Sequence, residues 1–567
     1  MRIVAIVGLV LCALVSPVLA QFATPLPSQV APQERRPPLE ADTMPVIPLP
    51  LPASPMDGAG ADLHIRLAAV DVTGAFDEAA WREDRFAAIT GHVVSLSDIR
   101  RAVAALQAAY DNAGYALVRI VVPPQTLRDG GRMQIRVVDG YIESVQADGV
   151  PETVRATVRA RLAGLVGQRR LRWSQLERQV LLAGSVPGLR LGSALLPGTA
   201  EAGVRLVVDG SFEAASVRVG ADTELPFSLG GREINASLVL NSPVGLGEQW
   251  LVSQTRGLGG AVHGRPPLNS TAFGVVMPIG PAGLTATPQV VRVDTAPMDT
   301  PGAPTSTGAY RRESLTIDYP LWAQRAGRLD AEGSIEHVAQ WQRAVDFGID
   351  LSRDIYRALR LQMSAEFSLS PRNAVSAKVS AGLGFGGRTQ AQAAESGIPM
   401  SRLGASSNFR KLGLDVTENW SCDGGWTLDT RVLAQSSLGH PLLRPELLAL
   451  DGAGQVSAFR AGDLAFDQGL LTRIELQRTA AFEVQGGHWT VRPYAFVAAG
   501  HGHLFQATEL EATVENARAA GLGWRSDSFD MARNSSLHLE LEGSRGWLEW
   551  SKPRTRTTWI ALAAWRF

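Results

Sequence analysis

The sequence is short of three features that mark common protein classes: cysteine, long apolar runs and a charge excess of either sign. It has only two cysteines in 567 residues, which excludes a small secreted domain held together by several disulfides. After residue 20 it has no apolar run of the about 18–20 residues that a membrane-spanning helix needs. The net charge is −1, from 54 basic and 55 acidic residues. This balance argues against a nucleic-acid-binding protein, which would carry a basic excess.

The first 20 residues have the layout of a signal peptide. A positive charge at Arg2 is followed by an apolar run from Ile3 to Val15, and Ala20 ends a typical cleavage site. We therefore predict that the chain is exported and that residues 1–20 are removed. Removal takes away Cys12 and leaves Cys422 as the one cysteine of the mature chain. An exported chain of this kind can enter a membrane only as a closed barrel, because lipid offers no partner to unpaired backbone groups.

The segment from residue 21 to residue 62 is rich in proline, which predicts an extended linker or arm without a packed core. An internal repeat follows. The tetrapeptide Val-Val-Asp-Gly stands at residues 137–140 and again at 207–210, each time after an amphipathic helix and a further strand. The sequence therefore predicts two related α+β domains with the element order β-α-α-β-β, at residues 63–141 and 142–210.

From residue 211 to residue 567 the pattern changes to short segments with a period of two. Leu537, Leu539 and Leu541, for example, alternate with polar residues. Apolar residues on one side and mostly polar residues on the other are typical of a transmembrane β-strand. The segment has room for about 16 strands of about 9–11 residues with their loops. We predict a C-terminal transmembrane antiparallel β-barrel of 16 strands.

The final segment, Arg554 to Phe567, is a strand of the same type. Trp559, Trp565 and Phe567 share one face, with alanines at the alternate positions between the two tryptophans. Aromatic residues at both ends of an apolar face are typical of the girdles of a barrel at the membrane surface. We predict that these three residues form the signal by which the barrel-assembly machinery recognises the chain.

Signal peptide, paired repeats and barrel together resemble the two-partner secretion transporters of the haemolysin-activator type (type V secretion), over residues 64–567. The resemblance implies that the two repeats are POTRA (polypeptide-transport-associated) domains. The first repeat resembles the family's first POTRA domain most closely where a Gly-Tyr pair precedes a strand that ends in Pro-x-Gln. The residues that carry this likeness are Gly114, Tyr115, Pro123 and Gln125.

A further resemblance concerns a long loop that folds back into the barrel in this family and carries Val-Arg-Gly and an aromatic residue at its tip. The matching residues are Val456, Ser457, Ala458 and Phe459, followed by Arg460, so Ser457 and Ala458 replace the family's arginine and glycine. The resemblance implies that this tip gates the pore or holds the conformation that lets the secreted client pass.

The strand motif that faces this tip in the family, Asp-x-Gly, corresponds to Asp467 and Gly469. In the family, the arginine of the tip pairs with the aspartate. Because that arginine is absent here, we hypothesise that Arg460 takes over a charge-assisted pairing with Asp467 that anchors the loop. The alternatives are that the loop is anchored differently or that transport is impaired.

The resemblance implies an outer-membrane transporter with its POTRA domains in the periplasm. They would bind an unfolded exoprotein of the haemolysin or adhesin type, which would then pass through the barrel pore. The partners implied are this exoprotein, the barrel-assembly machinery and outer-membrane lipid, with no nucleic acid and no cofactor. Two alternatives remain open. An assembly insertase of the same superfamily usually carries more than two POTRA domains, and a passive porin-like channel has no reason to carry any.

No enzyme is predicted, and no catalytic, cofactor-binding or metal-binding residue is proposed. The glycines of residues 382–387 fit the pattern GxGxxG, but no apolar-periodic helix follows them, as a nucleotide-binding loop would require. His501 and His503 have no third metal ligand nearby in the sequence.

Overall fold

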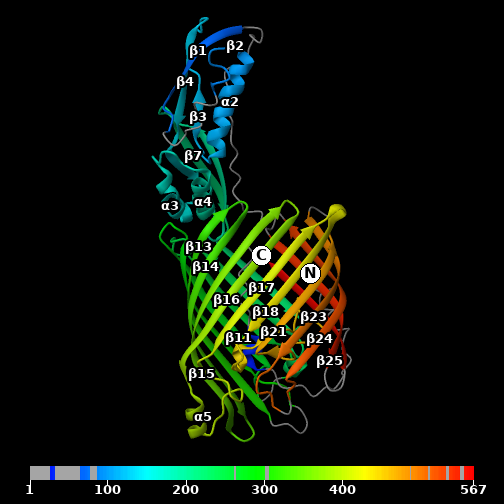
Figure 1. Ribbon diagram of the computed structural model, residues 1–567. Coiled ribbons are helices and arrows are strands. Elements are labelled where there is room, and N and C mark those ends of the chain that lie inside the picture. Colours follow the sequence, from blue (N-terminus) through cyan, green and yellow to red (C-terminus); the bar gives the residue numbers. More distant parts are fainter. Residues whose placement is uncertain are drawn as a thin grey trace.

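The computed structural model describes residues 26–31, 64–76, 86–260, 264–299, 305–484, 487–508, 511–530, 535–549 and 554–567. Two small α/β domains stand on one end of a large β-barrel (Figure 1). We call this end of the barrel the domain end and the opposite one the far end. The predicted signal peptide, residues 1–20, lies outside the described residues, and so does most of the proline-rich segment.

The first α/β domain is a mixed sheet covered by one long helix. Ser95 caps this helix, because its side chain accepts a hydrogen bond from Asp98 N at 3.2 Å while the Asp98 carboxylate accepts one from Ser95 N at 3.1 Å. Ile99, Leu106 and Tyr110 lie on one face of this helix and are buried against the sheet. The sheet has the order β2-β1-β4-β3, with β1 parallel to β4. The elements are β1 (His64–Thr73), β2 (Val93–Ser95), α2 (Leu96–Asn112), β3 (Val118–Val121) and β4 (Gly131–Asp139).

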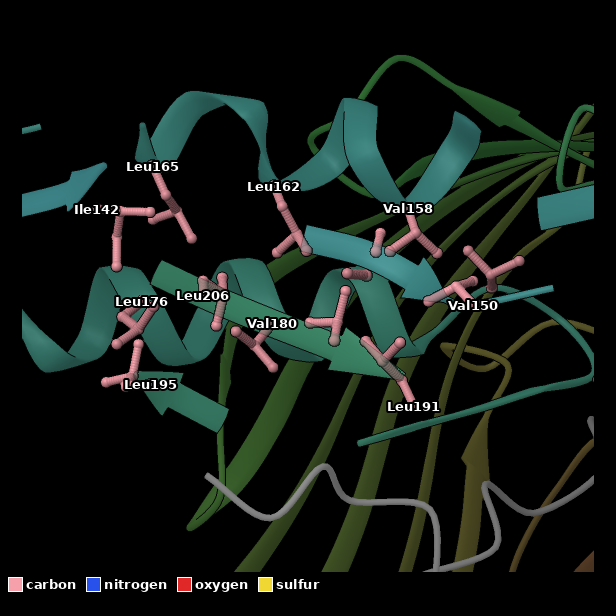
Figure 2. Packing of buried hydrophobic residues seen from close by; sticks show 14 of the residues in the cluster. Ile142, Val150, Val158, Leu162, Leu165, Leu176, Val180, Leu191, Leu195 and Leu206 are labelled. Atoms are coloured by element: carbon pink, nitrogen blue, oxygen red, sulfur yellow. The ribbon is translucent and has the colours of Figure 1, made fainter. Parts of the chain in front are cut away.

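The second α/β domain packs two helices on a three-stranded sheet of order β5-β7-β6. Leu162 and Val158 from one helix and Leu176 and Val180 from the other point into a common apolar core, together with Leu206 from the sheet (Figure 2). All five side chains are fully buried. The elements are β5 (Tyr141–Gly149), α3 (Glu152–Leu162), η5 (Ala163–Leu165), α4 (Trp173–Gly184), β6 (Leu189–Pro197) and β7 (Gly203–Phe212).

Backbone hydrogen bonds join the two domains. Ala116 N donates to Leu171 O and Trp173 N donates to Gly114 O, both at 2.8 Å, so segments of the two domains run antiparallel across the joint. Since backbone bonds of this kind have a fixed geometry, they define the angle between the domains more closely than side-chain contacts alone would.

The barrel wall is a closed antiparallel sheet. Its two parts β21 and β22 follow one another in the chain and both pair with β23, so they form one interrupted strand and the wall has 16 strands, as predicted. The wall consists of β8 (Ala215–Asp222), β9 (Glu233–Asn241), β10 (Gln249–Gly257), β11 (Leu268–Ile279), β12 (Leu284–Thr295), β13 (Ser306–Gln324), β14 (Gly327–Ala344), β15 (Ile349–Ser370), β16 (Asn373–Gly387), β17 (Arg410–Ser421), β18 (Trp426–Ser436), β21 (Gln468–Arg478), β22 (Ala480–Val484), β23 (Gly487–His503), β24 (Val514–Asp530), β25 (Ser535–Glu549) and β26 (Arg554–Arg566).

The alternation along these strands separates an apolar outer face from a polar inner one. In β26, Trp559 and Trp565 are each 50% exposed on the outer face, and Phe567 just beyond the strand is also about half exposed. Phe567 N donates to Val217 O at 2.9 Å and so lies where the last strand meets the first. Among the described residues, no helix is long and apolar enough to cross a membrane.

The second domain is held to the barrel by Glu177 of α4 and by Glu213, which follows β7. Arg325 N, in the turn after β13, donates to the Glu177 carboxylate at 2.9 Å, and Arg566 pairs with Glu213 at 2.8 Å. Within the second domain, the buried Arg161 guanidinium of α3 donates a hydrogen bond to Leu182 O of α4. Burial lowers the pKa of Arg161 to about 10, so the side chain stays charged at neutral pH. The second domain therefore sits at one mouth of the barrel in a defined orientation.

We predict that Leu176→Ala destabilises the second domain by about 2–5 kcal/mol, because it removes a fully buried side chain and leaves a cavity. Amide hydrogen exchange of α4 in the full-length protein measures this loss. Ser174→Ala, on the exposed face of the same helix, is the matched control and should change little. Equal exchange in the two variants would contradict the packing described here.

Candidate functional site: an inward loop in the barrel lumen

The loop between β18 and β21, residues 437–467, folds back inside the barrel. We call it the inward loop. It contains the short elements η8 (Arg444–Glu446), β19 (Leu448–Ala449) and β20 (Ala465–Phe466), and β19 pairs with β20 to form its stem. The predicted tip lies in the lumen: Val456, Ser457 and Ala458 are fully buried, and Phe459 and Arg460 are 5% and 6% exposed.

Backbone hydrogen bonds fold the tip into a compact turn. Gly452 N donates to Phe459 O, and Val456 N donates to Leu450 O, both at 3.0 Å. Gly452 and Gly454 have φ values of +93° and +71°, a conformation that residues with a Cβ atom adopt only at a cost. The glycines after β19 are thus the local reason why the chain can reverse here.

Small residues of the barrel wall make room for the tip. A Cβ atom at Gly546 of β25 would lie 2.6 Å from Ala458 Cβ and 2.8 Å from the Phe459 ring. A Cβ atom at Gly500 of β23 would lie 3.3 Å from Val456 Cγ2. The apolar side of the tip therefore packs against wall positions where a larger side chain would displace it.

A polar network holds Ser457. Its hydroxyl donates to the Glu542 carboxylate and accepts from the Arg473 guanidinium at 3.0 Å. Arg473 also pairs with Glu542 at 2.8 Å and with Glu475 at 3.0 Å, and it stacks 3.6 Å above the centre of the Phe496 ring. All four charged or hydroxyl-bearing side chains are buried. The cation next to the tip thus comes from strand β21 of the wall, and the loop contributes the Ser457 hydroxyl and the Gln455 carbonyl oxygen, which accepts from Arg473 at 3.2 Å.

The hypothesis that Arg460 pairs with Asp467 is wrong. Asp467 is fully buried and pairs with Arg402, from the loop between β16 and β17, at 2.6 Å. Leu442 N and Phe505 N also donate to Asp467, at 2.6 Å and 2.7 Å. Three loops of the far end therefore meet at one carboxylate, whose acceptor sites are filled without Arg460.

Arg460 instead reaches the first strand of the wall. Its guanidinium donates to the carbonyl oxygens of Thr223 and Leu225, just beyond the end of β8, and lies 4.1 Å above the centre of the Phe227 ring. The other predicted residue of the facing strand, Gly469, lies close to His501 O and the Leu448 side chain at the stem of the loop.

A third anchor of the inward loop is Glu446, which the sequence pattern did not single out. This buried carboxylate accepts a hydrogen bond from Tyr356 OH at 2.6 Å and pairs with Arg360 at 2.8 Å and Lys411 at 2.9 Å. The three partners come from the wall strands β15 and β17, which are remote in sequence from the loop. Only the polar positions on the inner face of these strands hinted at such a network.

A short segment of the N-terminal arm also lies in the lumen. It forms η1 (Pro27–Val30), drawn in blue inside the barrel (Figure 1). Ser28 N donates to the Gln340 side chain at 3.1 Å. Pro27 packs against Gly308, where a Cβ atom would lie 2.6 Å from Pro27 Cγ. The sequence predicted only an extended arm, because four residues carry too little periodicity to indicate a lumen-bound turn.

Of the predicted residues of the first domain, Gly114 and Tyr115 lie at its joint with the second, and Pro123 and Gln125 lie beyond the other end of β3. Gly114 has φ = +85°, ends the turn after α2 and accepts the bond from the second domain described above. Tyr115 is buried, and the Arg172 guanidinium lies 5.0 Å above its ring centre. The Gln125 amide continues the sheet past β3, since it donates to Gln134 O and accepts from Gln134 N, both at 2.8 Å. Pro123 lies beyond the end of β3, in the segment that leads to Gln125.

The motifs set aside as chemistry lie in barrel strands. Residues 382–387 form the end of β16, and both histidines lie at the end of β23. His501 Nδ1 is 2.8 Å from Asn516 Oδ1. In the part of the chain that the structure describes, no three histidine, cysteine, aspartate or glutamate side chains are arranged to hold a metal ion.

A closed 16-stranded barrel, an inward loop and two α/β domains at one mouth define a class of barrel transport proteins. The sequence model of the family described as haemolysin secretion/activation protein ShlB/FhaC/HecB matches residues 210–525. Because this match covers more than half of the chain, the protein belongs to that family. The model of the ShlB-type POTRA domain matches residues 64–140. The protein is therefore a two-partner secretion transporter, as the resemblance implied.

Solved structures show the same fold over the whole chain. CdiB from Escherichia coli has a TM-score of 0.70 and 19% identity, over 93% of this chain and 95% of that one. CdiB from Acinetobacter baumannii has a TM-score of 0.61 and 12% identity, over 100% of this chain and 97% of that one. A search of curated proteins gave no match.

We predict that Gly546→Val increases the ion conductance of the barrel in a planar lipid bilayer. The added side chain would occupy the space of Ala458 and Phe459 and push the tip out of its seat. Gly333→Val is the control, because a Cβ atom there would meet only Leu361, at 3.7 Å. A Gly546→Val barrel with the conductance of the unchanged protein would contradict the assigned seat.

We also predict that Ser457→Arg, which restores the arginine of the family motif, destabilises this protein. The new guanidinium would lie beside that of Arg473, and like charges at this distance repel each other in a buried site. Adding Arg473→Gln should restore stability, with a coupling energy of about 0.5–3 kcal/mol between the two positions. The midpoint temperature of the heat-modifiability transition on gels, measured for both single variants and the double variant, gives this coupling. Additive effects would show that Arg473 does not take the place of the tip arginine.

Proposed function

We propose that this transporter resides in the bacterial outer membrane and exports an unfolded exoprotein. In this proposal, residues 63–141 and 142–210 are the two POTRA domains and face the periplasm, and the far end of the barrel faces the cell exterior. The observation that carries the proposal is the inward loop. It lies in the lumen of a closed barrel and is held there by side-chain contacts with the wall and with other loops.

The anchors of the inward loop support a gating role. Asp467, Ser457 and Glu446 each bind wall or loop residues through buried charge-assisted hydrogen bonds, which are stronger than neutral ones. A client chain in the lumen would compete for the same space and for the same polar partners. We therefore propose that the loop tip, Val456 to Arg460, together with Asp467 and Gly469, forms the gate that a client displaces.

The two domains differ in the strand edge they offer to a client. An extended peptide can add a strand to an open sheet edge through main-chain hydrogen bonds. In the first domain, the Gln107 side chain occupies the outer edge of β3, since it donates to Val118 O at 3.1 Å and accepts from Ile120 N at 3.0 Å. In the second domain, β6 is a nine-residue edge strand with β7 on one side only. We propose that an unfolded client adds its strand at β6.

Transport needs no catalytic residue in this proposal. The client moves through a lumen lined with charged and polar side chains, and its folding outside the cell favours movement in one direction. Barrel biogenesis would use the general assembly machinery, with the C-terminal strand ending at Phe567 as its signal. An insertase function is not favoured, because the chain matches the model of a secretion family and that of its POTRA domain type.

We predict that deletion of residues 63–212 abolishes secretion of the client exoprotein while the barrel still assembles. The test measures the exoprotein in the culture medium in cells that carry the full protein, the deletion or no transporter. Heat-modifiability in the outer-membrane fraction checks that the shortened barrel is folded. Unchanged secretion from a cell with the deletion would contradict the role of the domains. Secretion by cells that lack the protein would contradict the proposed function altogether.

A further inference from the structure

The first strand, β8, and the last strand, β26, are joined by the shortest ladder of paired residues between neighbouring strands of the barrel wall. Strand β8 pairs with β26 from Arg218 opposite Arg566 to Asp222 opposite Leu562. One more backbone bond, from Thr223 N to Ala561 O at 3.0 Å, ends this ladder toward the far end. We call the junction the seam. On its other side, β26 continues to pair with β25 as far as Arg554.

Beyond β8 the chain turns away from β26, so backbone carbonyls near the seam are not paired with a neighbouring strand. Unpaired carbonyls inside a membrane are costly, because lipid offers them no donor. The carbonyls of Thr223 and Leu225 lie at this point, and the Arg460 guanidinium of the inward loop donates to both. Arg460 also stacks on Phe227, in the short helix η6 (Phe227–Leu229) that follows. The loop tip thus holds the β8 side of the seam.

The same tip holds the β26 side through different residues. Thr558 Oγ1 donates to Ala458 O at 2.7 Å, and the Arg556 guanidinium pairs with the Asp463 carboxylate. Asp463 also accepts from Arg460 N at 2.8 Å. One carboxylate of the loop therefore links the last strand to the backbone of the residue that binds the first strand.

We infer that the inward loop acts as a clasp that completes the closure of the barrel. In this clasp Arg460 binds the end of β8, and Asp463 binds β26. The clasp lies where the ladder between the two strands has ended, so it replaces the strand pairing that the seam lacks. Loop docking and seam stability are then coupled: withdrawal of the loop loosens the seam, and a loose seam weakens the seat of the loop. This inference deepens the proposed gate but does not depend on which client, if any, is exported.

The test is amide hydrogen exchange of the full-length protein in lipid nanodiscs. With Arg460→Gln we expect exchange at residues 219–223 and 561–565 to become faster by about tenfold or more, because the two carbonyls lose their charged donor. Asp463→Asn should give the same local pattern from the other side of the clasp, and Arg460→Lys, which keeps a charged donor, a smaller effect. Arg328→Gln is the matched control: it removes a lumen ion pair with Asp330 at 2.7 Å in β14, away from the seam.

Two outcomes would overturn the inference. Seam exchange within about twofold of the unchanged protein in both Arg460→Gln and Asp463→Asn would show that the loop does not support the seam. Faster exchange in all strands alike would show a general loss of stability with no special link to the seam. If Arg460→Gln does not fold, the same variant carrying Ala221→Cys and Ala563→Cys, which face each other across the seam, should fold when oxidised in a Cys422→Ser background. Failure of that rescue would also overturn the inference. Secretion is not a readout here, so an error in the proposed function would leave these results unchanged.

Discussion

Every backbone amide and carbonyl in the wall of a membrane barrel needs a hydrogen-bond partner from the protein, because lipid supplies none. Most of this chain meets that demand with long antiparallel ladders, such as the one that joins β14 and β15 along almost their whole length. The weak point is the seam, where β8 ends at Asp222 while β26 runs on. The inward loop supplies donors at this point, so the segment that we propose as the gate would also complete the wall.

The inward loop is held in the lumen by buried polar groups that bind other strands and loops of the barrel. Glu446 binds β15 and β17, Ser457 binds β21 and β25, and Asp467 binds the loop between β16 and β17. A buried ion pair contributes little net stability when compared with apolar packing, but loss of one partner is costly. Such contacts define one docked position of the loop sharply without making the docked state much more stable. This combination suits the proposed gate, which a competing chain would displace.

The sequence allowed much of the fold to be predicted, because the fold depends on periodicity. A period of two predicted the wall strands and their number, and the Val-Val-Asp-Gly repeat predicted two related domains. The buried tip could be located by a motif of four residues. The partner of Asp467 could not be located in the same way, because Arg402 lies 65 residues before it in a loop without any recognisable motif. The proline-rich arm gave no sign that residues 26–31 enter the lumen, since the seat for Pro27 is a gap at Gly308 that only the assembled barrel creates.

Replacement of the motif arginine by Ser457 has a consistent physical explanation. Glu542 and Glu475 are buried carboxylates that both pair with Arg473 of the wall, and Glu475 also pairs with Arg525. Once a wall residue carries this charge, a second guanidinium at the tip would be repelled, and a small hydroxyl that bridges Arg473 and Glu542 fits better. Arg460, two residues after the small Ala458, then binds the Thr223 carbonyl at the seam and lies outside the network of Ser457 and Arg473. The contact of Arg460 with the end of β8 would tie the proposed gate to the closure of the barrel.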